Sequence, residues 1–154
     1  LPALDLVKRI AASDERTSFV GSDYFYEDVS GRNPIEDNHE LIETTDNYYI
    51  VKSTPKDSSL VEFSYYKNYI HKTSFIPVKT EFYDKRDQLY RVSTAEAVET
   101  IQGHPTVVKA SIKDLKSGSQ TVMTHSGSEY DIGLPDDIFT ERYLRQPPME
   151  YIKR

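Results

Sequence analysis

The stretch "VEFSYYKNYIHKTSFIPVKTEF", residues 61–82, carries the clearest β pattern of the chain. Apolar or β-branched side chains alternate with polar ones on both sides of a polar break, at Val61, Phe63 and Tyr65 and again at Val78, Thr80 and Phe82. A period of two is typical of strands that have one covered face. The break at residues 71–74 is too short for a crossover connection, so we expect the two strands to pair as an antiparallel hairpin.

The same alternation recurs along the rest of the chain. It predicts further strands at residues 3–10, 40–43, 48–53, 89–94, 108–112 and 121–125. Short turn signals separate these segments, which favours an antiparallel meander of about seven or eight strands. Residues 94–101 also tolerate a helix, but between about residues 38 and 132 no amphipathic helix is long enough to cover a sheet.

Two short helices are expected outside the meander. The first is a turn capped by Ser22 that ends near Gly31, and the second runs from Asp136 to about Leu144. Pro147 ends the second helix, and residues 148–154 are expected to form a poorly ordered tail.

Composition limits the classes of function. The chain has 154 residues, enough for one domain, and 12 Tyr and 6 Phe that can bury large areas. The 19 basic and 25 acidic residues give a net charge of -6 without a basic cluster, so nucleic acid is not an expected partner. There is no cysteine for a disulfide or a thiolate metal site, and no apolar run approaches the length of a membrane-spanning helix.

The patterns of catalytic and metal sites are largely missing. The histidines at positions 39, 71, 104 and 125 lack the spacing of metal ligands and are expected at the surface or in turns. Asp23, Glu27 and Asp28 do not follow the order of a calcium loop, and the G-x-S-x-G motif and glycine-rich phosphate loops are absent. A carboxylate pair that meets across a cleft stays open, since sequence spacing does not give its separation.

A second stretch, "GSDYFYEDVSGR" at residues 21–32, combines three aromatic rings with three carboxylates. One interpretation of the many tyrosines is that they fill the core of a sandwich or barrel. Another is a half-open barrel whose apolar concave face takes an acyl chain, with the rings of this stretch as its cover. On that view the acids cap a short turn and keep its outer face in water.

This stretch resembles the "MGSDFSYEDLSGR" segment of the LolA-like family of outer-membrane lipoprotein-sorting proteins. Other segments are similar to that family in the same order: "LPALDLVKRIAAS" (1–13), "YYIVKSTPKD" (48–57), "SFIPVKTEFYDKRDQL" (74–89) and "YDIGLPDDIFTERYLRQP" (130–147). The family's methionine and small polar residue are replaced here by Val20 and Phe25, which makes the turn bulkier.

The resemblance implies a mainly β fold, a strongly curved antiparallel sheet or incomplete barrel of the LolA/LolB type with one or two short helices. It implies a single domain over residues 1–147 that lacks the N-terminal strands and helix of the family, and a periplasmic location. It also implies a non-enzymatic carrier of lipoprotein acyl chains or another lipid, with an envelope transporter as a possible partner and without a cofactor.

We therefore expect a lipid-binding site made of two groups of side chains. The cover consists of Phe19, Tyr24, Phe25 and Tyr26, and the concave wall is represented by Phe63, Val78, Phe82, Val108 and Ile112. A register slip of one residue would move the wall to the other face. The alternatives are an interaction module that binds no lipid and docks, or dimerises, through exposed sheet edges, and an enzyme that uses a carboxylate pair.

Overall fold

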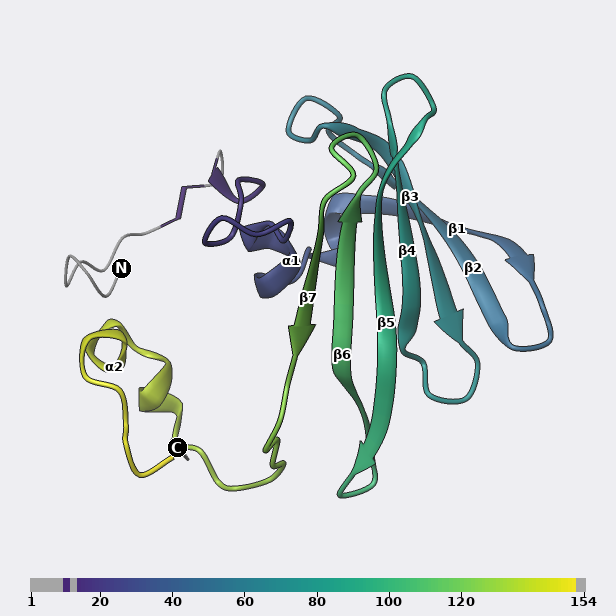
Figure 1. Ribbon diagram of the computed structural model, residues 1–154. Helices are drawn as coiled ribbons and strands as arrows, with labels where there is room; N and C mark the ends of the chain where they lie inside the picture. The colour runs from purple at the N-terminus through teal and green to yellow at the C-terminus, as the bar shows by residue number, and fades with distance from the viewer. Residues whose placement is uncertain (1–9, 12–13, 152–154) are drawn as a thin grey trace.

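A seven-stranded antiparallel sheet forms the centre of the computed structural model, which describes residues 10–11 and 14–151 (Figure 1). The strands are β1 (Asp37–Thr44), β2 (Tyr48–Pro55), β3 (Phe63–His71), β4 (Pro77–Asp84), β5 (Leu89–Ile101), β6 (His104–Asp114) and β7 (Gln120–Thr124). Each strand pairs with the next along the chain, so the predicted meander is confirmed. Residues 94–101 continue β5 rather than form a helix. The strand expected at residues 3–10 falls almost wholly outside the described residues.

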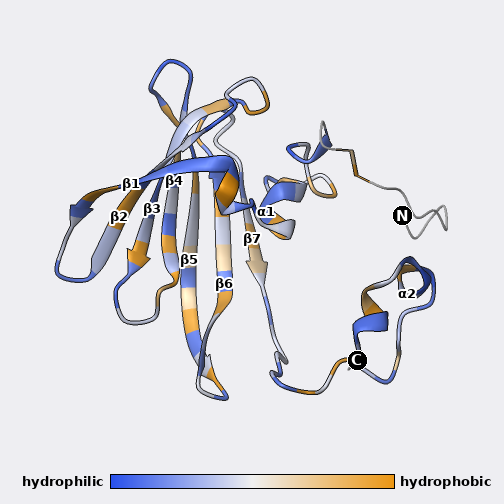
Figure 2. Cartoon of the chain, turned by 180° about the vertical axis from the view of Figure 1, so that it is seen from behind, coloured by the Kyte–Doolittle hydropathy of each residue, from blue (hydrophilic) through white to orange (hydrophobic). Residues whose placement is uncertain are grey.

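The sheet is curved and does not close, because β1 and β7 are its two edges (Figure 1). This confirms the expected fold class, a mainly β protein with an incomplete, strongly curved antiparallel sheet. Hydrophobic and hydrophilic residues alternate along β5, as a sheet with one covered face requires (Figure 2). The curvature gives the sheet an inner face, which we define as the face that carries Ile112.

Bulges change which side chains share that face. The register of β3 against β4 shifts between Phe63 and Tyr65, so that Tyr66 pairs with Phe82 while Tyr65 pairs with Tyr83. The rings of Tyr65 and Tyr83 stack on the outer face at 4.6 Å. The simple alternation that grouped Tyr65 with Phe63 is therefore wrong, because a bulge places one extra residue in a strand and reverses the parity beyond it.

The tightest part of the core lies at one end of the inner face. Val61, Phe63, Tyr66 and Tyr90 are buried together, and Phe82 packs against them. The rings of Phe63, Tyr66 and Phe82 lie 5.5–5.6 Å apart with tilted or edge-on geometry. Aromatic pairs of this kind stabilise a fold by about 0.5–1.5 kcal/mol beyond the area that they bury.

Both expected helices form, the first shorter than expected and the second interrupted. The first begins at Tyr26 rather than at Ser22, because the Asp28 carboxylate accepts the Phe25 backbone N–H at 2.6 Å and caps α1 (Tyr26–Ser30). The second is interrupted at Thr140 and consists of the 3₁₀ turn η4 (Asp136–Phe139) and α2 (Glu141–Arg145). A further 3₁₀ turn, η3 (Pro34–Glu36), leads into β1. No helix within residues 14–151 is long and apolar enough to cross a membrane.

Candidate functional site: a recess on the inner face

Five directly paired residues form a row across the inner face. The row is Asn68, Thr80, Ser93, Ile112 and Thr121, one residue from each strand from β3 to β7. Paired residues of antiparallel strands point to the same side of a sheet. Residues 14–36, which we call the roof segment, reach this side, because Asp23 hydrogen-bonds Thr121 and Asp28 pairs with Arg91 of β5.

A recess of about 400 Å³ lies between the roof segment and the row. The sheet contributes polar groups and rings, and the roof segment contributes one ring and several charges. The lining residues are Tyr24, Glu27, Asp28, Gly31, Arg32, Pro34, His39, Tyr66, Asn68, Pro77, Thr80, Phe82, Ser93 and Ile112. A volume of this size lies within the range of small-molecule pockets, about 300–1,000 Å³.

Arg91 fastens the roof segment to β5. Its side chain is only 4% exposed, and its guanidinium donates to both carboxylate oxygens of Asp28 and to the backbone carbonyl of Asp23. The same guanidinium lies 4.1 Å from the ring centre of Phe25 and 5.2 Å from that of Phe82. A bidentate pair that also stacks on rings fixes both position and orientation.

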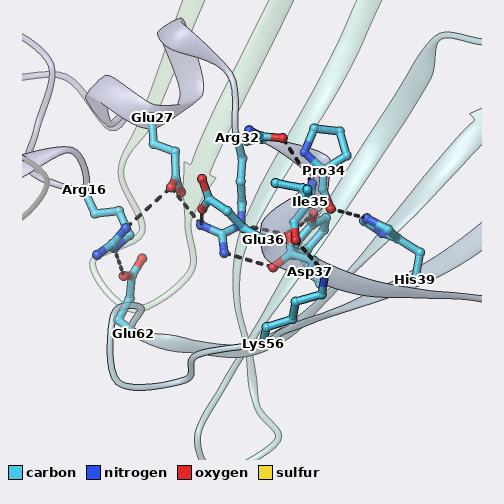
Figure 3. A network of polar contacts seen from close by, with 12 residues as sticks. Arg16, Glu27, Arg32, Pro34, Ile35, Glu36, Asp37, His39, Lys56 and Glu62 are labelled. Carbon is cyan, nitrogen blue, oxygen red and sulfur yellow. Dashed lines mark hydrogen bonds and ion pairs between the residues drawn. The ribbon is translucent and has the colours of Figure 1, made fainter.

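A second fastening joins the roof segment to the start of β1 (Figure 3). Arg32 donates from Nε and Nη2 to the two oxygens of buried Asp37, each at 2.9 Å, and also pairs with Glu27 and Glu36. The hydroxyl of Tyr66 donates to the same Asp37 carboxylate at 2.7 Å. Burial alone would raise the pKa of Asp37, but the hydrogen bonds from Arg32 and Tyr66 outweigh it and lower that pKa. Burial and the bond to Asp37 raise the pKa of Tyr66 to about 12.

Asp23 forms the third fastening, to the opposite edge of the sheet. Its carboxylate accepts hydrogen bonds from Ser119 at 2.5 Å and Thr121 at 2.7 Å, and its N–H donates to the Thr121 hydroxyl at 3.0 Å. The bonds from Ser119 and Thr121 lower the pKa of Asp23. The roof segment is thus tied to β1 by Arg32, to β5 by Asp28 and to β7 by Asp23. Asp23 and Asp28 are two of the acids that the sequence singled out.

Tyr24 is the one buried side chain of the roof segment within the described residues. It is 6% exposed and lines the recess, yet its hydroxyl has no hydrogen-bond partner among the residues that the structure describes. Burial raises the pKa of this hydroxyl, so it stays protonated at neutral pH.

The structure brings some of the expected site residues together and separates others. Tyr24, Phe82 and Ile112 line the recess, and Phe25 lies against the guanidinium of Arg91. Phe19 and Tyr26 form an edge-on pair at 5.4 Å and line a smaller recess outside the main one.

The remaining wall residues do not reach the recess. Phe63 lies in the core, 1% exposed, and Val78 is half-buried on β4 beside the lining residues Pro77 and Thr80. Val108 lines a separate recess near Ser126 and Ser128. A lipid-binding role stays a prediction for all nine residues.

Sequence reasoning missed Arg91 and Arg32, as well as the polar residues of the row. The only available signal for Arg91 was a charged residue inside a predicted strand, a position that usually requires a partner when it is buried. Among the described residues, no group of three His, Asp or Glu side chains is arranged to hold a metal ion. His39 instead bonds Ser53 and the carbonyl of Pro34, each at 2.8 Å.

Comparison with known proteins supports the resemblance seen in the sequence. A family model described as "Uncharacterized protein" matches residues 1–146. Two solved structures superpose over 94% of the chain: a DUF1329 family protein from Desulfovibrio piger (32% identity, TM-score 0.82) and a putative outer membrane lipoprotein-sorting protein domain from Vibrio parahaemolyticus (24%, 0.81). A LolA superfamily protein from Nitrosomonas europaea matches 84% of it (26%, 0.62). The chain belongs to the family that the matching model describes, and it shares its fold with a LolA superfamily protein and a lipoprotein-sorting domain.

This LolA-like chain spans 62%, 63% and 60% of the lengths of those three proteins, respectively. Among curated proteins, none matches its sequence. Two of the three structures carry names that refer to LolA or to lipoprotein sorting. Their fold resembles the sheet on which the recess lies, so these two proteins are the ones to compare with it when its function is considered.

Proposed function

We propose that this LolA-like protein is a carrier that shelters an acyl chain of a lipoprotein or another lipid on the inner face of its sheet. The observation that carries the proposal is the recess of about 400 Å³ beneath the roof segment, with Phe82 and Ile112 in its lining. Support also comes from the structural neighbour named as a putative outer membrane lipoprotein-sorting protein domain.

The recess suits an amphiphile better than a fully polar molecule. Its rings and Ile112 offer apolar contact, whereas Asn68, Thr80 and Ser93 keep part of the floor polar. Each buried methylene contributes about 0.8 kcal/mol, so a segment of roughly six methylenes would gain on the order of 5 kcal/mol. That gain corresponds to modest, reversible binding, which a carrier needs in order to release its cargo.

The roof segment acts as a fastened cover in this proposal. Cargo enters when the contacts of Arg91 and Asp23 open, and the cover closes again when they re-form. A ligand that binds only the open form shifts this equilibrium by its differential affinity. The rings of Tyr24 and Phe25 move with the cover, which gives the aromatic stretch of the sequence its role.

The wider setting is part of the same proposal. We place residues 1–147 in one LolA-like domain that acts in the periplasm without catalysis and passes its cargo to or from an envelope transporter. The name of one structural neighbour, a putative outer membrane lipoprotein-sorting protein domain, supports a role in the cell envelope.

The direct test fills the recess without touching the fastenings. Ser93 lines the recess, whereas its neighbour Thr94 pairs with Lys79 and points to the outer face. We expect Ser93→Phe to weaken binding of a fluorescent dodecanoyl probe at least tenfold, and Thr94→Phe to leave the affinity within about twofold. Equal affinities for both variants, with unchanged circular dichroism, would show that the probe binds elsewhere.

A second candidate function rests on the exposed edge of the sheet. Seven of the eight residues of β1 are exposed, including Leu41 at 58% and Ile42 at 42%. An edge strand of this kind can accept a strand from a partner or a second copy, as an interaction module would. Native mass spectrometry separates the two functions: retained acyl ligand supports the carrier, and a ligand-free dimer after reconstitution with lipid supports the module.

A further inference from the structure

The hydroxyl of Tyr24 is the one buried side-chain polar atom of the described residues that has no hydrogen-bond partner. Tyr24 lines the recess from the roof side, and its buried hydroxyl has no partner among residues 10–11 and 14–151. Withdrawing a hydroxyl from water without a replacement bond destabilises the closed, empty form. The neighbouring rings Phe25 and Tyr26 are only half-buried, so this penalty falls on the one ring of the stretch that lines the main recess.

The charges around the recess indicate which acceptor would suit this donor. Arg32 is paired with Asp37 and Glu27, and Arg91 is paired with Asp28. Both guanidiniums therefore already have carboxylate partners, and two carboxylates but only one guanidinium are among the lining groups. A free fatty-acid carboxylate would meet net repulsion there, whereas a neutral carbonyl oxygen would not.

We propose that Tyr24 is the polar anchor of the recess and donates its hydroxyl hydrogen bond to the ester or amide carbonyl of a bound acyl chain. The proposal rests on the carrier function and narrows its ligand class to esterified or amide-linked acyl chains. Tyr24 belongs to the roof segment, so the shift that admits the chain also uncovers the hydroxyl. The ligand oxygen then replaces the bond that the closed form lacks.

The test uses two ligands that differ only in the carbonyl. The first, 1-lauroylglycerol, carries an ester; the second, 1-dodecylglycerol, has the same head group and chain length but an ether link. We expect Tyr24→Phe to weaken binding of the ester by about three- to tenfold and to leave binding of the ether unchanged. Tyr83→Phe removes a hydroxyl from a ring on the outer face of the sheet, and it should change neither affinity.

The outcomes separate this proposal from the carrier function. If the wild-type protein binds neither glycerol lipid, the carrier function fails. If it binds both lipids and Tyr24→Phe weakens both equally, or neither, the carrier function stands and the anchor is wrong. Thermal unfolding gives an independent readout: an unchanged or higher melting temperature of empty Tyr24→Phe supports an unpartnered hydroxyl, and a lower one contradicts it.

Discussion

The pair between Asp28 and Arg91 offers the sharpest test of how the roof segment is held. Asp28→Asn keeps the shape of the side chain and an oxygen that can accept the Phe25 N–H, but it removes the charge opposite Arg91. Breaking a buried ion pair costs about 3–5 kcal/mol when the remaining charge has no other partner. Arg91 keeps the Asp23 carbonyl and two rings, and Asp28 is 17% exposed, so we expect a loss of about 2–3 kcal/mol.

A second variant, Arg91→Met, distinguishes the energy of the Asp28–Arg91 pair from the general effect of substituting either residue. Arg91→Met keeps an apolar stem between Phe25 and Phe82 and leaves Asp28 able to turn to water. The double variant should be less destabilised than the sum of the two single variants by about 2 kcal/mol, because each single change breaks the same pair. Urea unfolding measures these differences. A matched control is Glu96→Gln in the exposed pair with Lys109, which should leave stability nearly unchanged.

Hydrogen exchange shows whether the loss is local to the roof segment. If the Asp28–Arg91 pair is weakened by about 2 kcal/mol, hydrogen exchange of the Phe19 and Tyr26 amides should become about 30-fold faster, because these amides are exposed when the roof segment opens. Exchange of the amides that join β5 to β6 should follow only the global stability. Two results would refute the idea that this pair holds the roof segment: stability losses of the single variants that simply add in the double variant, or faster exchange across the whole sheet with no extra effect on the roof segment.

Three further predictions follow from the fastenings and the core. Asp37→Asn should cost about 2–3 kcal/mol in unfolding experiments, because it leaves Arg32 with weaker partners. The lowered pKa of Asp37 makes its contribution fully present above about pH 4 and lost as the pH falls through the folded pKa, and acid titration of the variant should lack that step. Phe63→Ala should cost about 3–5 kcal/mol by calorimetry. Thr121→Val should lower the unfolding free energy by about 1 kcal/mol and at least double the exchange rate of the Asp23 amide. An unchanged rate would contradict the fastening of Asp23 to Thr121.

The meander was predictable because its signals are local. Alternation and short turns are properties of neighbouring residues, and they located β3 and β4 to within a few residues. The faces were harder to predict, since the bulge between Phe63 and Tyr65 moves Tyr65 to the outer face, where Lys52 lies 4.3 Å from its ring centre. A bulge leaves no mark in a hydrophobic pattern other than a break in parity.

Two of the three fastenings of the roof were not predictable, because they join residues far apart in the chain. Asp28 and Arg91 are 63 positions apart, and Asp23 and Thr121 are 98 apart. The sequence indicated that the aromatic stretch covers something and that its acids cap a turn. Asp28 does cap α1, yet the same carboxylate also binds Arg91, a second role that only the folded sheet creates.

Two opposing contributions to the free energy of the closed roof come from a stretch of only five residues. The pairing of Asp28 with Arg91 favours closure, whereas the buried hydroxyl of Tyr24 opposes it. A pair of this kind is worth about 2–3 kcal/mol by the reasoning above, and an unsatisfied hydroxyl costs about 1–3 kcal/mol. Because the two energies are of similar size, a ligand that only accepts a hydrogen bond from this hydroxyl would shift the equilibrium between the closed and the open roof noticeably. A carrier needs such near-equality, since a cover held much more tightly would exclude the cargo and one held much more loosely would expose the recess to water.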